Sequence, residues 1–171
     1  QPIPLTLSTP TPIALVIDPS PDNTLYMAFS QGVLKTTDGG GSWQDLTQPT
    51  FDGGFVQQLA IDPTAPATLY AAWIAVANQT VTLFRSVDGG ATWTTPSPGL
   101  PAAIGNVYAL VVAPTAPNQL YATASNGDVL GSSDGGAHWT VLADTFDFVP
   151  LLVPDAIVDG VLYAAYGDFE A

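Results

Sequence analysis

An eight-residue segment recurs three times along this chain of 171 residues, and it limits the folds open to the chain more than any other feature. The copies read TTDGGGSW, SVDGGATW and SSDGGAHW, at positions 36–43, 86–93 and 132–139. Each copy, here called a DGG turn, joins turn-forming aspartate and glycine to a bulky tryptophan. The aspartate can accept hydrogen bonds from its own turn, and the glycines permit positive φ angles. The pattern therefore predicts a self-satisfied β-turn with an apolar anchor.

A Leu-Tyr pair precedes each DGG turn, and a further pair occurs near the C-terminus. The pairs are Leu25-Tyr26, Leu69-Tyr70, Leu120-Tyr121 and Leu162-Tyr163. A short apolar run followed by proline stands before each of them. Repeats spaced by roughly 40–50 residues are typical of β-propellers, in which one repeat forms one four-stranded blade. The sequence thus predicts an all-β fold, a β-propeller with three complete four-stranded blades and a partial fourth.

The expected blades cover approximately residues 13–50, 55–98, 105–145 and 148–171, the last being partial, and residues 1–12 form a Pro/Thr-rich segment or a closing strand. The first strand of a blade is the apolar run, such as Ala14–Ile17 or Ala109–Val112, which we expect to be buried on both faces. The second strand contains Leu-Tyr, the third ends before the DGG turn, and the fourth begins near its tryptophan. The second repeat is longer in its middle, which predicts an extended hairpin around Ala75–Thr82.

An incomplete fourth blade leaves strand edges and blade faces to be covered. Three explanations stay open. The chain is a fragment of a longer protein, which we favour, or it is completed by a copy of itself or another subunit. In the third, the alternating segment Ile3–Leu7 completes the last blade.

The DGG turn resembles the Asp-box, or BNR, repeat, and the resemblance covers roughly Pro10 to Tyr166. Members of that family fold as β-propellers and include sialidases, xyloglucanase-type glycosidases, sortilin-type receptors and photosystem II assembly factors. The resemblance implies that the Asp box is a structural turn, commonly remote from an active site. By that resemblance nine residues are structural: Asp38, Gly40 and Trp43; Asp88, Gly90 and Trp93; Asp134, Gly136 and Trp139.

The charge and the residue composition argue against several classes of function. Fifteen acidic residues stand against two basic ones, and the net charge of −13 argues against nucleic-acid partners and against anionic membrane surfaces. There is no cysteine, and His138 is the sole histidine, so a Cys/His zinc site is excluded. We expect no metal site, no cofactor and no direct membrane insertion. Scarce lysine and a Thr/Pro-rich start are compatible with an extracytoplasmic protein.

Catalytic chemistry finds little support in the sequence. Sialidases of the Asp-box family use three arginines to bind the substrate carboxylate, whereas this chain has Arg85 alone. A glycosidase needs two carboxylates at a defined separation, and no pair stands out among the fifteen acidic residues. His138 lies inside a DGG turn, with no nucleophile elbow in the chain. We therefore assign no catalytic residue.

Aromatic residues recur four positions after the leucine of the Leu-Tyr pair, as Phe29, Trp73 and Tyr166, with Ala124 in the third repeat. Aromatic platforms bind sugar faces, so these three are the candidate ligand-facing residues. Core packing between blades is the alternative that we favour.

The leading functional hypothesis is a non-catalytic extracytoplasmic module for protein–protein interaction or assembly, within a cell-surface or membrane-associated complex. Its partner is a protein or a second copy of the chain. The alternative is a carbohydrate-active propeller, either a fragment of a xyloglucanase-like glycosidase or a lectin-like glycan-binding module. A third hypothesis is a surface-layer or filament subunit that polymerises through open blade edges.

Overall fold

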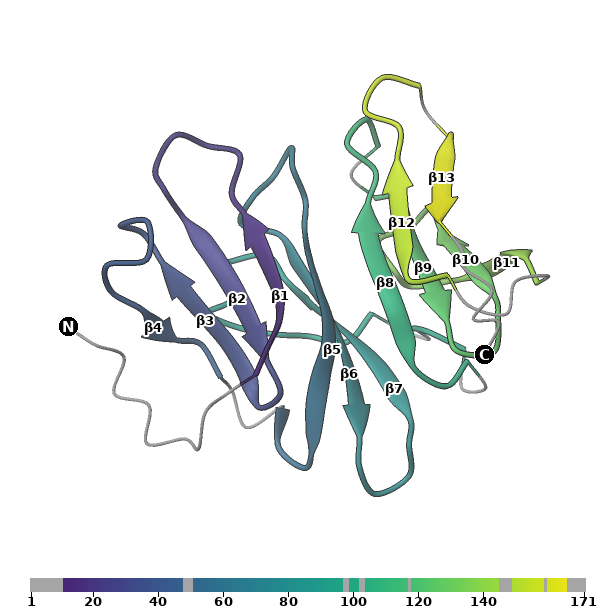
Figure 1. The fold of residues 1–171 in the computed structure, drawn as a ribbon, viewed down its shortest axis with the longest axis horizontal. Coiled ribbons are helices and arrows are strands. Elements are labelled where there is room, and N and C mark those ends of the chain that lie inside the picture. Colours follow the sequence, from purple (N-terminus) through teal and green to yellow (C-terminus); the bar gives the residue numbers. More distant parts are fainter. Residues whose placement is uncertain are drawn as a thin grey trace, which may run out of the picture.

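The computed structural model describes residues 11–47, 51–96, 99–101, 104–116, 118–144, 149–158 and 160–165. These residues form four antiparallel sheets, each a meander in chain order. Figure 1 shows the sheets side by side in the order of the sequence, and their first strands, β1, β5, β8 and β12, contact one another in succession. Residues 1–10, with the closing strand predicted at Ile3–Leu7, lie outside the described residues.

Sheet 1 consists of β1 (Pro12–Ile17), β2 (Leu25–Phe29), β3 (Gly32–Thr36) and β4 (Gln44–Asp45). Sheet 2 consists of β5 (Gly54–Ile61), β6 (Leu69–Ala75) and β7 (Val81–Ser86). Sheet 3 consists of β8 (Val107–Val112), β9 (Leu120–Ala124), β10 (Val129–Ser132) and β11 (Thr140–Ala143). Sheet 4 has β12 (Leu151–Pro154) and β13 (Leu162–Ala165).

The repeats fold alike because their strands pair in the same register. The second strand of sheets 1 to 3 contains Leu-Tyr, and the third strand ends at the Ser or Thr that opens the DGG turn. The first strands of these three sheets are all interrupted by a register shift at the equivalent place, between Pro12 and Ala14, Val56 and Gln58, and Val107 and Ala109. Because the bulge recurs at the same position of three repeats, it is a regular feature of the repeat and not a local defect.

Among the described residues, which leave out 97 and 98, the second sheet has three strands where the sequence predicts four. A single bridge joins Arg85 to Thr94, with both backbone hydrogen bonds formed at 2.7 and 2.8 Å. The next hydrogen-bonded position along that strand is Pro96, which has no N–H to donate. The expectation of a four-stranded second blade is therefore wrong, and proline is the physical reason. The longer hairpin joins Ala75 to Val81 through residues 76–80, within the predicted segment.

The core lies between successive sheets. Tyr26 of sheet 1 belongs to the same apolar cluster as Leu69 of sheet 2, and Tyr70 of sheet 2 belongs to the same cluster as Leu120 of sheet 3. Tyr121 shares a third cluster with residues of sheet 4. At these three junctions the tyrosine of one Leu-Tyr pair faces the following sheet and the leucine of the next pair faces the preceding sheet, as expected for neighbouring side chains on a strand.

The prediction that first strands are buried on both faces holds for β8 but is wrong for β1. Ile13, Leu15 and Ile17 of β1 are 38, 56 and 63% exposed. Among the described residues no sheet covers that face of sheet 1, so the same apolar pattern that is buried in β8 faces solvent in β1.

Candidate functional site

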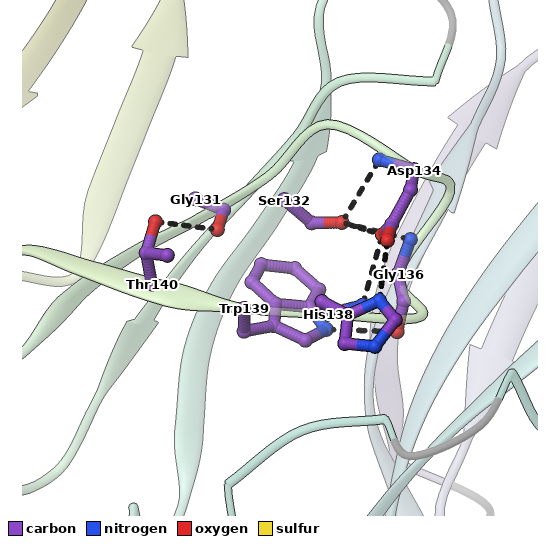
Figure 2. A network of polar contacts seen from close by, with 7 residues as sticks. All are labelled: Gly131, Ser132, Asp134, Gly136, His138, Trp139 and Thr140. Atoms are coloured by element: carbon purple, nitrogen blue, oxygen red, sulfur yellow. Dashed lines mark hydrogen bonds and ion pairs between the residues drawn. The ribbon is translucent and has the colours of Figure 1, made fainter.

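Each DGG turn is closed by its own side chains. In the third turn, drawn in Figure 2, the Ser132 hydroxyl donates to Asp134 Oδ1 at 3.0 Å and accepts from the backbone N–H of Gly136 at 3.0 Å. Asp134 Oδ1 also accepts from the backbone N–H of His138 at 2.8 Å, while its Oδ2 contacts His138 Nδ1 at 2.6 Å. The Trp139 indole N–H donates to the Gly136 carbonyl at 3.0 Å.

The first two DGG turns repeat the hydrogen bonds to the aspartate, with hydroxyl residues in place of histidine. Ser42 donates both its N–H and its hydroxyl to Asp38, at 2.9 and 2.6 Å. Thr92 does the same to Asp88, at 2.8 and 2.6 Å. His138 thus takes the place of a turn hydroxyl and bonds the aspartate of its own turn.

These hydrogen bonds hold the turn carboxylates in their charged form. The Ser42 hydroxyl is the largest of the causes that keep the pKa of Asp38 well below its usual range. The Thr92 hydroxyl lowers the pKa of Asp88 to about 2, and the backbone N–H of His138 lowers the pKa of Asp134 to about 2. All three carboxylates are solvent-exposed, so they stabilise the turn locally and form no buried catalytic pair.

The glycines of the second DGG turn are pressed against sheet 1. A methyl group placed on Gly89 would stand 3.1 Å from the Tyr26 hydroxyl, and one on Gly90 would stand 2.6 Å from Leu46 Cδ1. Both glycines have positive φ angles, +68° and +86°. Close approach to the preceding sheet is therefore a second reason, besides backbone conformation, for glycine at these positions.

The third turn meets sheet 2 in the same way, because Gly135 lies beside the Tyr70 hydroxyl and Gly136 against Leu83. The first turn differs. Its Gly39 and Gly40 meet only Asn23 and Trp43, which belong to the same repeat. Among the described residues, then, the first DGG turn presents its glycines to no other sheet.

The two basic residues of the chain occupy one repeat position. Lys35 pairs with Tyr26 across β2 and β3 and holds its ammonium 5.2 Å from the ring centroid. Arg85 pairs with Tyr70 and lies 5.9 Å from that ring. In sheet 3 the equivalent partner of Tyr121 is Gly131. A pocket of about 360 Å³ lies there, and its walls include Tyr121, Gly131, Asp134 and Leu142.

The two outer faces of the sheet stack are apolar and exposed. We call Ile13, Leu15 and Ile17 of β1 the head face, and Leu151, Val153 and Tyr163 of sheet 4 the tail face. The tail residues are 55, 46 and 59% exposed. The Tyr163 hydroxyl donates to Asp155 Oδ2 at 3.0 Å, and this hydrogen bond raises the pKa of Tyr163.

Equivalent residues in the other repeats are buried. Leu15 of the head face is 56% exposed, while its counterparts Leu59, Leu110 and Leu152 are 4, 4 and 3% exposed. Tyr163 is 59% exposed, while its counterparts Tyr26, Tyr70 and Tyr121 are 2, 0 and 4% exposed. The head and tail faces are thus repeat positions that are core elsewhere in the same chain, which single-residue hydrophobicity in the sequence could not reveal.

The aromatic candidates within the described residues, Phe29 and Trp73, are not part of these faces. Phe29 is 2% exposed. Trp73 is half-buried, packs edge-on against Phe84 and donates its indole N–H to the Phe51 carbonyl at 3.2 Å. Tyr166 lies outside the described residues. Of the turn tryptophans, Trp93 is buried against Phe51, and Trp43 and Trp139 are half-buried.

A larger pocket, of about 650 Å³, lies between sheets 1 and 2, and sequence reasoning missed it. Its walls include the carboxylates of Asp45 and Asp52, the amide of Gln31 and the buried ring of Phe51. The two aspartates come from β4 and from the segment that enters β5, and neither belongs to a repeated motif. Within the described ranges, no three His, Cys, Asp or Glu side chains gather as a metal site would require.

Comparison with known proteins gives the fold a wider context. No protein-family model matches the chain. A xyloglucanase from Paenibacillus sp is 28% identical over 178 residues, which cover 90% of this chain and 16% of that protein. The GH74 enzyme of Niastella koreensis superposes with a TM-score of 0.74 at 19% identity, covering 95% of this chain and 27% of its own.

YCF48 from Cyanidioschyzon merolae has a TM-score of 0.63 at 18% identity, covering 82% of this chain and 42% of its own. A structure of YCF48 bound to a D1 peptide has a TM-score of 0.60 at 14% identity, covering 79% and 41%. These neighbours are β-propellers, and the likeness establishes a β-propeller fold for the chain. The chain spans less than half the length of each of these proteins. No helix in the described part is long and apolar enough to cross a membrane.

Proposed function

We propose that the chain is a non-catalytic, extracytoplasmic β-propeller module of Asp-box repeats that acts by binding protein, within a cell-surface or membrane-associated assembly. One observation carries the proposal. The head face exposes Leu15 and the tail face exposes Tyr163, and the counterparts of both residues are buried wherever a neighbouring sheet is present. Contiguous exposed apolar surface of this kind marks protein interaction sites.

Burial of these exposed side chains by a partner would supply free energy of binding. Covering an exposed leucine or valine is worth about 1.5–3 kcal/mol per fully buried side chain, so several of them on one face favour association. A likeness in fold to YCF48, which has been solved with a bound D1 peptide, supports the same class of function. The charge of −13 disfavours nucleic acid as the partner.

A photocrosslinking amino acid at Leu15 tests the proposal in the source organism. We expect a covalent adduct with a protein, identified by mass spectrometry after ultraviolet exposure. The matched control places the same group at Asn126, an exposed polar residue of the β9–β10 turn away from both faces. Adduct formation at Leu15 no greater than at Asn126, with the same result at Tyr163, would contradict the proposal.

A second candidate function is carbohydrate binding or cleavage. The observation that favours it is the pocket of about 650 Å³ that brings Asp45 and Asp52 together with Gln31. Two carboxylates on one pocket are the equipment of a glycosidase when their separation suits the reaction. The 28% identity with a xyloglucanase supports this candidate over other enzyme classes.

Reducing-sugar release and calorimetric titration with xyloglucan oligosaccharides separate the two candidates. A glycosidase predicts turnover that falls at least about 100-fold in both Asp45→Asn and Asp52→Asn. A lectin-like module predicts binding without turnover. The leading proposal predicts neither, and Asp128→Asn, at an exposed β-turn, is the control substitution.

A further inference from the structure

The three junctions between successive sheets follow one rule. The tyrosines of sheets 1, 2 and 3 pack into the cluster shared with the following sheet, and that cluster also holds the first-strand leucine of the following sheet, which is Leu59, Leu110 or Leu152. Where the following sheet carries a DGG turn, the tyrosine hydroxyl lies beside the first glycine of that turn, as Tyr26 does at Gly89 and Tyr70 at Gly135. Each junction thus joins the tyrosine face of one sheet to the leucine face of the next, and at two of the three a glycine of a DGG turn also lies beside the tyrosine hydroxyl.

The head and tail faces are the two halves of one such junction. The head face is a leucine face, because Leu15 is the counterpart of Leu59, Leu110 and Leu152. Its DGG turn offers Gly39, which meets no residue of another sheet in the described part of the chain. The tail face is a tyrosine face, because Tyr163 pairs with Val153 as Tyr26 pairs with Val16.

We propose that the head face of one copy of this chain binds the tail face of a second copy, with Tyr163 of one copy beside Gly39 of the other. The inference rests on the proposed function and names its partner. The occupant is a second copy because the internal junctions show which surface a leucine face accepts, and the chain itself presents that surface at its other end. The hydrogen bond from Tyr163 to Asp155 holds the tail tyrosine in place before binding.

A head-to-tail contact uses two different surfaces, so it either closes into a ring or propagates. Two copies joined at both contacts bring together eight sheets, which lies within the range of about 4–8 blades in propellers. The charge of each copy, −13, opposes association, and added salt screens this repulsion. Association therefore strengthens as ionic strength rises, which is the reverse of a contact made by opposite charges.

Sedimentation velocity of the purified 171-residue chain, with Leu15→Asp, Tyr163→Asp and their mixture, tests the proposal. The native chain is expected to associate, and more tightly at 0.5 M than at 0.05 M salt. Either substitution weakens self-association at least about 100-fold, because it places a charge in an apolar junction. An equimolar mixture of the two variants forms a 1:1 dimer, because each retains the face that the other has lost.

Val141→Asp is the matched control, because Val141 is 52% exposed on β11 and belongs to neither face. It is expected to leave association unchanged, and near-ultraviolet circular dichroism confirms that each variant is folded. A native chain that stays monomeric at both salt concentrations overturns the inference, as does a mixture that shows no dimer. If the monomeric chain still crosslinks a different protein through Leu15 in the source organism, the inference fails while the proposed function stands.

Discussion

Sheets 1 and 2 are built from the same repeat, yet they differ in the burial of equivalent leucines. Leu59 in β5 is 4% exposed, and Leu15 in β1 is 56% exposed. The bulge and the strand pairing are alike in the two sheets. The difference lies in the neighbour, because sheet 1 covers Leu59 while no described sheet covers Leu15. The burial of these leucines is therefore set by the junctions between sheets.

The largest expected effect comes from truncating the two leucines. Leu59→Ala should lower the free energy of unfolding by about 2–4 kcal/mol, because it leaves a cavity in the junction between sheets 1 and 2. Leu15→Ala should lower it by about 0.5 kcal/mol or less in dilute monomer. Urea unfolding of both variants at low protein concentration measures the contrast. Equal losses would show that the head face is covered within the monomer.

The glycines of the DGG turns give a second contrast. Gly90→Ala and Gly40→Ala both place alanine at a positive φ angle, so the backbone strain is shared. The methyl group at Gly90 also meets Leu46 Cδ1 at 2.6 Å, whereas at Gly40 it would stand 3.8 Å from Trp43 Cζ2 of the same turn. We expect Gly90→Ala to cost about 1–2 kcal/mol more than Gly40→Ala in the same unfolding experiment. A reversed order would mean that the turn does not press on the preceding sheet.

The cation over the tyrosine ring separates sheets 1 and 2 from sheet 3. Lys35→Met keeps the apolar stem and removes the ammonium 5.2 Å from the Tyr26 ring, so a loss of about 0.5–1 kcal/mol is expected. Thermal unfolding at low and high salt measures it. Thr82→Met, at a half-buried position on β7, is the control for the new side chain. If Lys35→Met and the native chain unfold at the same temperature, the ammonium group of Lys35 does not stabilise sheet 1.

Acid should weaken the DGG turns, with the smallest effect. The pKa of Asp88 is about 2 in the fold and near 3.8 when the chain is unfolded, so the unfolded chain binds the proton first. The stabilisation by Asp88 is fully present above about pH 4 and is lost as the pH falls from about 4 toward 2. Asp88→Asn should make the free energy of unfolding vary less steeply with pH in that window. An unchanged slope would contradict the turn hydrogen bonds.

The sequence anticipates what is local to a repeat. The Leu-Tyr pairs locate the second strands, and the serine or threonine of each DGG turn locates the end of the third strand. Both are predictable because a turn depends on residues that are neighbours in the sequence. Three features escaped it. Pro96 stops the fourth strand of sheet 2 because it cannot donate a hydrogen bond to β7. The exposure of Leu15 depends on whether a neighbouring sheet is present, and Asp45 and Asp52 line one pocket only after sheets 1 and 2 pack.

Cysteine labelling is the most direct test of the central claim, that the head and tail faces are uncovered halves of a junction. The chain has no cysteine, so Leu15→Cys, Tyr163→Cys and Leu59→Cys each create one thiol. In dilute solution the first two should react with a maleimide quickly and Leu59→Cys slowly. As protein concentration rises, labelling at positions 15 and 163 should slow together while labelling at position 59 stays slow. Slow labelling at positions 15 and 163 in dilute monomer, or rates there that do not change with concentration, would contradict the account.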